Sequence, residues 1–180
     1  MKFNSQKYHR RSIRLPDYDY SQPGEYFITI VTHGRACLFG RIKNGEMHLN
    51  EAGRIVWDIW YSLPVRYPQI ALGAAVVMPN HFHGNVIINE PPVGAIHELP
   101  QRVVQRDRQM QRRCMTLPLV VGYFKMNSAK RINELLGSQG IPVWQRNYYE
   151  HIIRNDQEYN RIHLYIEANV DNWIQDDDFR

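Results

Sequence analysis

The chain has 180 residues, of which 43% are hydrophobic and 12% aromatic, so the composition excludes a wholly disordered protein and suits a single domain. Its two cysteines, Cys37 and Cys114, argue against a disulfide scaffold or a thiolate zinc site and suit a reducing cytoplasm. The formal net charge is +4, so nucleic acid is the leading expected partner, although a solvated basic surface would explain charge alone equally well.

The basic residues gather in two segments. The first fourteen residues hold five cations and no acid, and residues 102–113 hold five arginines and a single acid. Neither the polar N-terminus nor the longest apolar stretch, residues 71–78, has the form of a secretory signal or a membrane span. We therefore expect no membrane partner.

The first half of the chain predicts a strand, a hairpin and a helix. Residues 25–33 are rich in aromatic and β-branched side chains, which is typical of a strand. Residues 38–49 predict a hairpin whose turn is Asn44-Gly45. Residues 51–63 have apolar side chains at helical spacing, and Pro64 is expected to end this helix.

The second half predicts a strand pair, two helices and further β-structure. Residues 70–78 and 81–88 indicate an antiparallel pair broken at Pro79-Asn80. Helical spacing returns over residues 117–136, with Val120, Phe124, Ile132 and Leu135 or Leu136 as expected core residues and Gly137 as C-cap. Residues 143–153 predict a strand or strand pair, and Asn155 or Asp156 is expected to cap a last helix.

Because strands and helices do not alternate strictly, we expect an α+β domain with an antiparallel sheet covered by helices. One domain is expected to span residues 1–180. Within it, residues 1–24 form a basic N-terminal arm, and the Gln- and Arg-rich residues 91–115 form a flexible insertion.

The sharpest local motif is His81-Phe82-His83. On a strand the two histidines point to the same face, where neutral imidazoles can hold one divalent ion. Two surface histidines on a half-exposed strand are the alternative, and the motif alone favours that alternative.

A second pair lies near the C-terminus. Tyr165 and Asn169 are four residues apart on the expected last helix and so share one face. Asn169 could complete a metal site while Tyr165 attacks a phosphorus atom. Periodicity alone favours a simpler reading, in which Tyr165 packs in the core and Asn169 caps the helix.

Four blocks of the sequence resemble the REP-associated tyrosine transposases, a branch of the single-tyrosine HUH nucleases. They lie in order over most of residues 8–173, outside the insertion. These blocks are RRSIRLPDYDYSQPGEYFITIVT, MPNHFH, LPLVVGYFKMNSAKRINELLG and VWQRNYYEHIIRNDQEYNRIHLYIEANVDNW.

The resemblance implies a ferredoxin-like antiparallel sheet with helices packed on it and a transposase-type endonuclease and strand transferase. The implied substrate is single-stranded DNA carrying a hairpin from a palindromic repeat. His81, His83 and Asn169 would bind Mg²⁺ or Mn²⁺, and Tyr165 would form a covalent 5′-phosphotyrosine. The family usually has Asn-Pro where this chain has Asn169-Val170, so the end of the helix is expected to differ.

Other residues compete for these roles or support them. Tyr148, Tyr149 and Tyr159 are rival nucleophiles, Glu150 and His151 might touch substrate or metal, and Tyr8, Tyr18 and Tyr20 could either stack on bases or pack in the core. The residues expected to bind DNA are Lys7, Arg10, Arg11, Arg14, Lys125, Lys130 and Arg131.

Three rival functions stay open. A catalytically silent nucleic-acid-binding module would need the basic surface alone. A metal-dependent nuclease that activates water would leave no covalent adduct. A small-molecule enzyme is disfavoured by the charge distribution. The protein is expected to act as a monomer or a homodimer.

Overall fold

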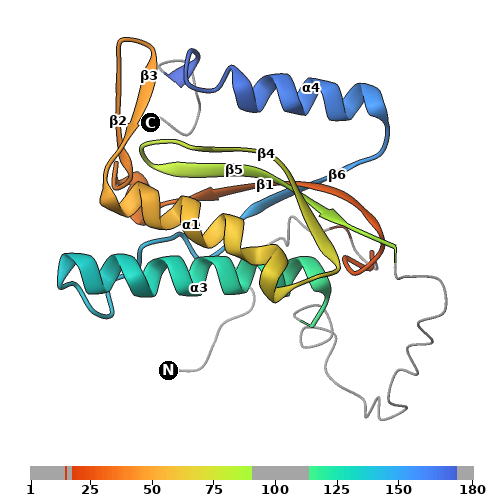
Figure 1. Ribbon diagram of the computed structural model, residues 1–180, viewed down its shortest axis with the longest axis horizontal. Helices are drawn as coiled ribbons and strands as arrows, with labels where there is room; N and C mark the ends of the chain where they lie inside the picture. Colours follow the sequence, from red (N-terminus) through yellow and green to blue (C-terminus); the bar gives the residue numbers. More distant parts are fainter. Residues whose placement is uncertain (1–14, 16–17, 91–113, 174–180) are drawn as a thin grey trace, which may run out of the picture.

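The computed structural model describes residues 15, 18–90 and 114–173. The strands and helices, in chain order, are β1 (Gly24–Val31), a 3-10 turn (His33–Arg35), β2 (Gly40–Lys43), β3 (Glu46–Leu49), α1 (Glu51–Arg66), β4 (Ile70–Val77), β5 (His81–Ile88), α3 (Thr116–Leu136), β6 (Tyr149–Ile153) and α4 (Asp156–Glu167). Four strands form one sheet in the order β4-β5-β1-β6, and β2 pairs with β3 in a separate hairpin (Figure 1).

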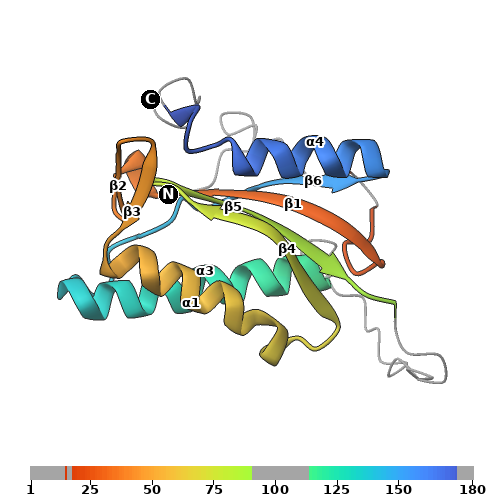
Figure 2. The same cartoon turned by 45° about the horizontal axis from the view of Figure 1, so that its top comes forward.

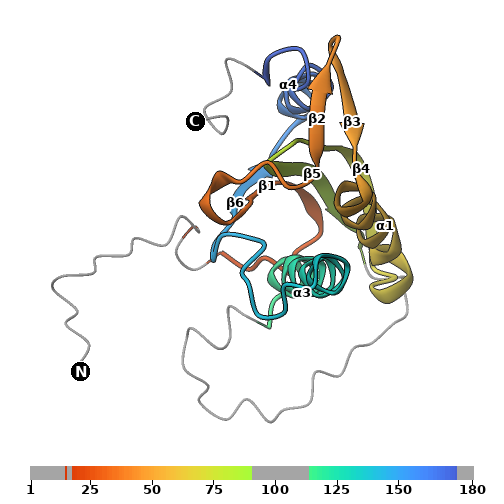
Figure 3. The same cartoon turned by 90° about the vertical axis from the view of Figure 1, so that its left-hand side faces the viewer.

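The sheet has helices on both faces. α1 and α3 lie on one face and α4 on the other (Figures 2 and 3). All three strand pairs in the sheet are antiparallel. The succession β1-α1-β4-β5-α3-β6 and this strand order are those of a ferredoxin-like unit, to which α4 is added. The predicted α+β class with an antiparallel, ferredoxin-like sheet is confirmed.

The larger core lies between the sheet and the helices α1 and α3. Trp60, Phe82, Phe124 and Trp144 meet there at ring-centroid distances of 4.8 to 5.9 Å. A Cβ on Gly84 would come within 2.8 Å of the Trp60 ring, so the glycine lets this ring lie against β5. Aromatic burial of this kind supplies much of the stability of a small domain.

Two local predictions are confirmed by backbone geometry. Asn44 and Gly45 both have positive φ, 55° and 75°, as a type I′ hairpin turn requires. Gly137 has φ 62° and caps α3 in the left-handed conformation. The predicted strand pair over residues 70–88 is also present as β4 and β5.

The prediction that Pro64 ends the first helix was wrong. α1 continues to Arg66, and the Tyr67 N–H still donates to the Leu63 carbonyl. A proline removes its own hydrogen bond to the carbonyl four residues earlier, but the next bonds survive when it lies in the last turn.

Two further expectations need correction. Leu135 and Leu136 are exposed rather than buried, because the core side of α3 ends at Ile132. In the expected strand region 143–153, regular pairing begins at Tyr149, and Trp144 makes one isolated bridge to Thr32.

The arm and the insertion fall mostly outside the described residues, which leave out 1–14, 16–17 and 91–113. At the described end of the arm, Tyr20 is 3% exposed and packs beside Tyr18 and Tyr26, as the core reading expects. Among the described helices, none has the length and apolar character needed to cross a bilayer.

Candidate active site

The two histidines of the motif lie on β5, on the face covered by α4. Alternation along the strand sends Phe82 into the larger core and leaves His81 and His83 on the opposite side. Their ring centroids are 4.5 Å apart, and they are 0% and 1% exposed. Such burial excludes the alternative of two surface histidines.

Hydrogen bonds from neighbouring residues fix the orientation of both rings. The Asn80 Oδ1 atom lies 2.8 Å from Nδ1 of His81, and the Asn80 amide donates to the Arg35 carbonyl at 3.4 Å. A carbonyl oxygen can only accept, so Nδ1 of His81 carries a proton and Nε2 is the unprotonated nitrogen of the neutral ring. Thr29 Oγ1 lies 2.8 Å from Nδ1 of His83 and orients the second ring in the same way.

The electrostatic surroundings keep His83 neutral. Burial lowers the pKa of the His83 imidazole well below its usual value, and the neighbouring His81 lowers it further. A metal ligand must be deprotonated, so a neutral ring is already in the binding form at neutral pH.

Tyr165 comes to this pair from the far end of the chain. Its hydroxyl is 3.4 Å from Nε2 of His83, and the two ring centroids are 5.3 Å apart. Phe27 on β1 contacts both rings, at 5.3 Å from His83 and 6.1 Å from Tyr165. Tyr165 is 45% exposed, so its hydroxyl is at the surface of the site while the histidines lie beneath it.

Helix α4 is held in place at its first turn. The Asn155 side chain accepts from the Glu158 N–H at 2.9 Å and caps the helix. The Glu158 carboxylate contacts Nε2 of His151 on β6 at 2.7 Å and accepts from the Arg154 N–H at 2.9 Å. These hydrogen bonds lower the pKa of Glu158, the Arg154 N–H making the largest contribution. They fix the helix that carries Tyr165 to the edge of the sheet.

The segment after α4 crosses the histidine pair. α4 ends at Glu167, so Asn169 lies beyond the helix, contrary to the expected helical placement; the Asn169 N–H donates to Ile166, three residues back. Trp173 follows and stacks on His81 with a ring-centroid distance of 5.8 Å. The chain therefore passes from Tyr165, which contacts His83, to Trp173, which contacts His81. Asn169 lies halfway between these two residues in the sequence.

The chemistry of these side chains fits a divalent ion held by two imidazoles and an amide. Asn169 is 2% exposed, and among the described residues its Oδ1 atom has no hydrogen-bond partner. Leaving a buried amide oxygen without a donor costs free energy, which binding to a cation would recover. In the described part of the chain, no group of three His, Cys, Asp or Glu side chains is placed to hold a metal ion.

The rival tyrosines lie in different surroundings. Tyr149 is on the same sheet face and contacts Phe27, whereas Tyr148 lines a groove on the opposite face. Tyr159 stacks on His163 with ring centroids 5.9 Å apart. Among the other polar candidates, His151 binds Glu158, and Glu150 is buried on the side of the larger core.

The basic residues expected to bind DNA are not gathered at the histidine pair. Lys130 and Arg131 are exposed on α3, on the opposite side of the sheet. The Lys125 ammonium donates to three backbone carbonyls, which favours a structural role, and burial lowers its pKa to about 8. Lys7, Arg10, Arg11 and Arg14 lie outside the described residues. A DNA contact by any of these seven residues stays a prediction.

Three residues that contact the histidine pair were not predicted from the sequence: Thr29, Asn80 and Trp173. Asn80 directly precedes the motif, and an amide beside a histidine pair was a usable signal. Thr29 comes from a strand more than fifty residues away, and its role depends on the β1–β5 register, in which it pairs with His83. No local pattern contains that register.

Comparison with known proteins finds a relative by sequence and, among solved structures, a protein with the same fold. No protein-family model matches the chain. An uncharacterized protein of Haemophilus influenzae is 41% identical over 177 residues, which is 97% of this chain and 96% of that protein.

Among solved structures, a REP-associated tyrosine transposase bound to a REP hairpin matches with a TM-score of 0.56 and 19% identity, over 87% of this chain and 71% of that chain. A putative transposase from Deinococcus radiodurans matches with a TM-score of 0.48 and 18% identity, over 86% and 95% of the two chains. The chain belongs to the same family as the Haemophilus influenzae protein and has the fold of the REP-associated tyrosine transposase.

Proposed function

We propose that this protein is a metal-dependent single-strand DNA endonuclease and strand transferase in which Tyr165 is the nucleophile. The observation that carries the proposal is the Tyr165 hydroxyl, 3.4 Å from Nε2 of the buried, neutral His83. The shared fold and the REP hairpin bound by the matching transposase support a hairpin-bearing DNA substrate. The basic composition of this chain is also consistent with a polyanionic partner.

His81, His83 and Asn169 would hold a divalent ion, Mg²⁺ or Mn²⁺. Bound there, the ion would supply positive charge against the negative charge that develops on the phosphate oxygens. Asn80 and Thr29 orient the two rings for this role. Because the ligand set contains no carboxylate, the site itself adds no negative charge to repel a phosphate.

The proposed reaction is a transesterification. The Tyr165 oxygen attacks the phosphorus in line and loses its proton to solvent. The bond from phosphorus to the 3′ oxygen breaks, leaving a 5′-phosphotyrosine and a free 3′-hydroxyl. Because the new phosphodiester keeps the energy of the old one, a 3′-hydroxyl from another strand can attack it and release Tyr165.

A covalent-trapping assay tests this proposal. Purified protein is incubated with 5′- or 3′-labelled hairpin DNA with single-stranded flanks and Mn²⁺, and the mixture is run on a denaturing gel. The wild-type protein is expected to form an adduct that needs the metal, and both Tyr165→Phe and His81→Ala to form none. Tyr159→Phe, on the same helix and away from His83, is the matched control for the tyrosine substitution.

Each other outcome contradicts part of the proposal. Cleavage without an adduct, retained in Tyr165→Phe, would mean that water is the nucleophile. Tight DNA binding without cleavage, across several hairpin sequences and both metals, would mean that the protein is a binding module.

A further inference from the structure

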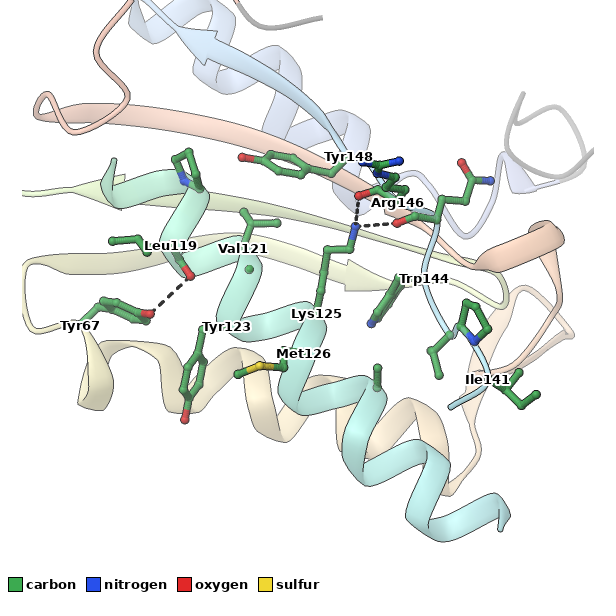
Figure 4. A pocket seen from close by; sticks show the side chains of 16 residues that line it. Tyr67, Leu119, Val121, Tyr123, Lys125, Met126, Ile141, Trp144, Arg146 and Tyr148 are labelled. Carbon is green, nitrogen blue, oxygen red and sulfur yellow. Dashed lines mark hydrogen bonds between the residues drawn. The ribbon is translucent and has the colours of Figure 1, made fainter. Parts of the chain in front are cut away.

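A groove lies on the side of the sheet opposite α4, away from the histidine pair. Its walls are residues 118–129 of α3 and the loop of residues 141–148, with Tyr67 at the end of α1 (Figure 4). Its volume is about 770 Å³, within the range of about 300–1,000 Å³ that small-molecule sites occupy. It shares no residue with the candidate active site.

The lining combines aromatic rings with positive charge. The aromatic side chains are Tyr67, Tyr123 and Tyr148, together with Trp144, which is only 6% exposed. The cations are Arg146, which is exposed, and Lys125, whose ammonium is bound to backbone carbonyls. No carboxylate occurs among the described residues of the lining. Rings that offer stacking surfaces beside cations complement a flat base attached to a phosphate, which is the combination found where proteins hold single-stranded nucleic acid.

One residue of the wall keeps the groove open. Gly122 is exposed in the interior of α3, and a Cβ built on it would meet nothing within 4 Å. Glycine weakens a helix interior relative to alanine, and packing does not demand glycine at this position. Because Gly122 has no side chain, the groove stays open beside Tyr123 and Lys125.

Two adjacent tyrosines join the groove to the catalytic face. Tyr148 lines the groove, while Tyr149 pairs with Thr29 on the other face and contacts Phe27 at 6.4 Å. Phe27 in turn contacts Tyr165. β6 is the edge strand of the sheet, so a DNA strand could pass from one face to the other over this edge.

We propose that the groove binds unpaired nucleotides of the same DNA strand that Tyr165 cuts on the opposite face. This inference rests on the proposed function. Lys125 maintains one wall, because its ammonium donates to the carbonyls of residues 145 and 146 at 2.6 and 3.2 Å (Figure 4). It also donates to the carbonyl of residue 147 at 3.1 Å. The loop so held presents Arg146 and Tyr148.

The test measures how much a single-stranded extension adds to affinity. Fluorescence anisotropy without metal compares a labelled hairpin with the same hairpin carrying ten unpaired thymidines, on the 5′ side and then on the 3′ side. In the wild-type protein one extension is expected to tighten binding roughly tenfold or more, since each stacked base contributes a factor of this order. Gly122→Phe, which fills the groove, is expected to bring that ratio close to one.

Leu136→Phe is the matched control, because it adds a ring at an exposed position of α3 outside the groove. A second measurement uses the wild-type chain: iodouridine in the extension is expected to cross-link under light to peptides containing Tyr123 or Tyr148. Because both measurements omit metal and cleavage, a failure of the tyrosine mechanism leaves them interpretable.

An unchanged ratio in Gly122→Phe, or cross-links confined to the catalytic face, would overturn the proposal. So would free thymidine monophosphate competing as well as the extended strand, which would indicate a mononucleotide site. A dimer that Gly122→Phe dissociates, with the extension effect intact, would assign the groove to a second copy of the chain.

Discussion

The two faces of the sheet are built for different tasks. Toward α1 and α3 the buried side chains are almost all apolar, and large rings such as Trp60, Phe82 and Phe124 have exposed fractions near zero. Toward α4 the buried apolar cluster is small: Phe27, Ile153, Ile162 and Ile166. The remaining buried side chains on that face include His81, His83 and Asn85.

This difference shows where the fold obtains its stability and where it places its chemistry. Buried polar groups cost free energy unless they are paired, and a face that carries several of them contributes less to folding. The larger core lies on the other side of the sheet, and its apolar burial offsets the free energy that the buried polar groups cost. Stability and function are therefore expected to respond to different substitutions.

A matched pair of phenylalanine substitutions gives the largest expected effect. Phe124→Ala is expected to lower the free energy of unfolding by about 3–5 kcal/mol, because the ring is fully buried among other rings. Phe27→Ala removes the same atoms from the small cluster and is expected to cost less. Urea denaturation measures both. Equal losses would break the contrast between the faces.

Substitutions behind the histidines are expected to alter function more than stability. Asn80→Ala and Thr29→Val each remove the group that orients one ring, and a loss of metal affinity of about 10–100-fold is expected. Isothermal titration with Mn²⁺ measures it, with Asn127→Ala on α3 as control. Metal affinity equal to that of the wild type would contradict the roles given to Asn80 and Thr29.

Asn85 should be replaceable with a gain in stability. It is 0% exposed, and neither of its amide atoms has a hydrogen-bond partner among the described residues. Asn85→Leu is similar in size and removes the cost of burying the amide, so the free energy of unfolding is expected to rise by about 1–3 kcal/mol. A fall in the urea midpoint would show that burying the Asn85 amide does not destabilise this face of the sheet.

The smallest expected effect depends on pH. The pKa of Glu158 is lowered in the folded protein, so its stabilising effect is present above the usual glutamate pKa and is lost as the pH falls through the lowered value. Thermal melting of the wild type and Glu158→Gln should therefore differ at pH 7 and converge in acid. A difference that persists at pH 3 would show that the Glu158 carboxylate does not hold α4 by its charge.

The sequence predicted the elements that depend on local chemistry. The type I′ turn at Asn44-Gly45 and the cap at Gly137 were correct because those residues favour the required backbone conformations. The helix end at Pro64 was wrong because neighbouring hydrogen bonds outweighed one lost donor. The strand predicted over residues 143–153 was too long, because apolar and aromatic side chains also occur in loops that pack on a core.

The residues at the centre of the site could be predicted from the sequence, but the residues that contact and orient them could not. Histidines two apart on a strand must share a face, so His81 and His83 could be paired from sequence. That Tyr165 meets His83 was expected from the resemblance, since helical spacing alone favoured a core residue. Thr29 and Trp173 could not be found, because both depend on contacts between segments far apart in the chain.

The most direct test of the central claim is to identify the residue that carries the DNA. The covalent adduct formed with Mn²⁺ is digested with nuclease and protease, and mass spectrometry locates the peptide that bears a nucleoside 5′-phosphate. The account predicts that this group lies on Tyr165, in the peptide that also contains Glu167 and Asn169. A nucleotide on Tyr149 or Tyr159, or cleaved DNA with no modified tyrosine, would contradict it.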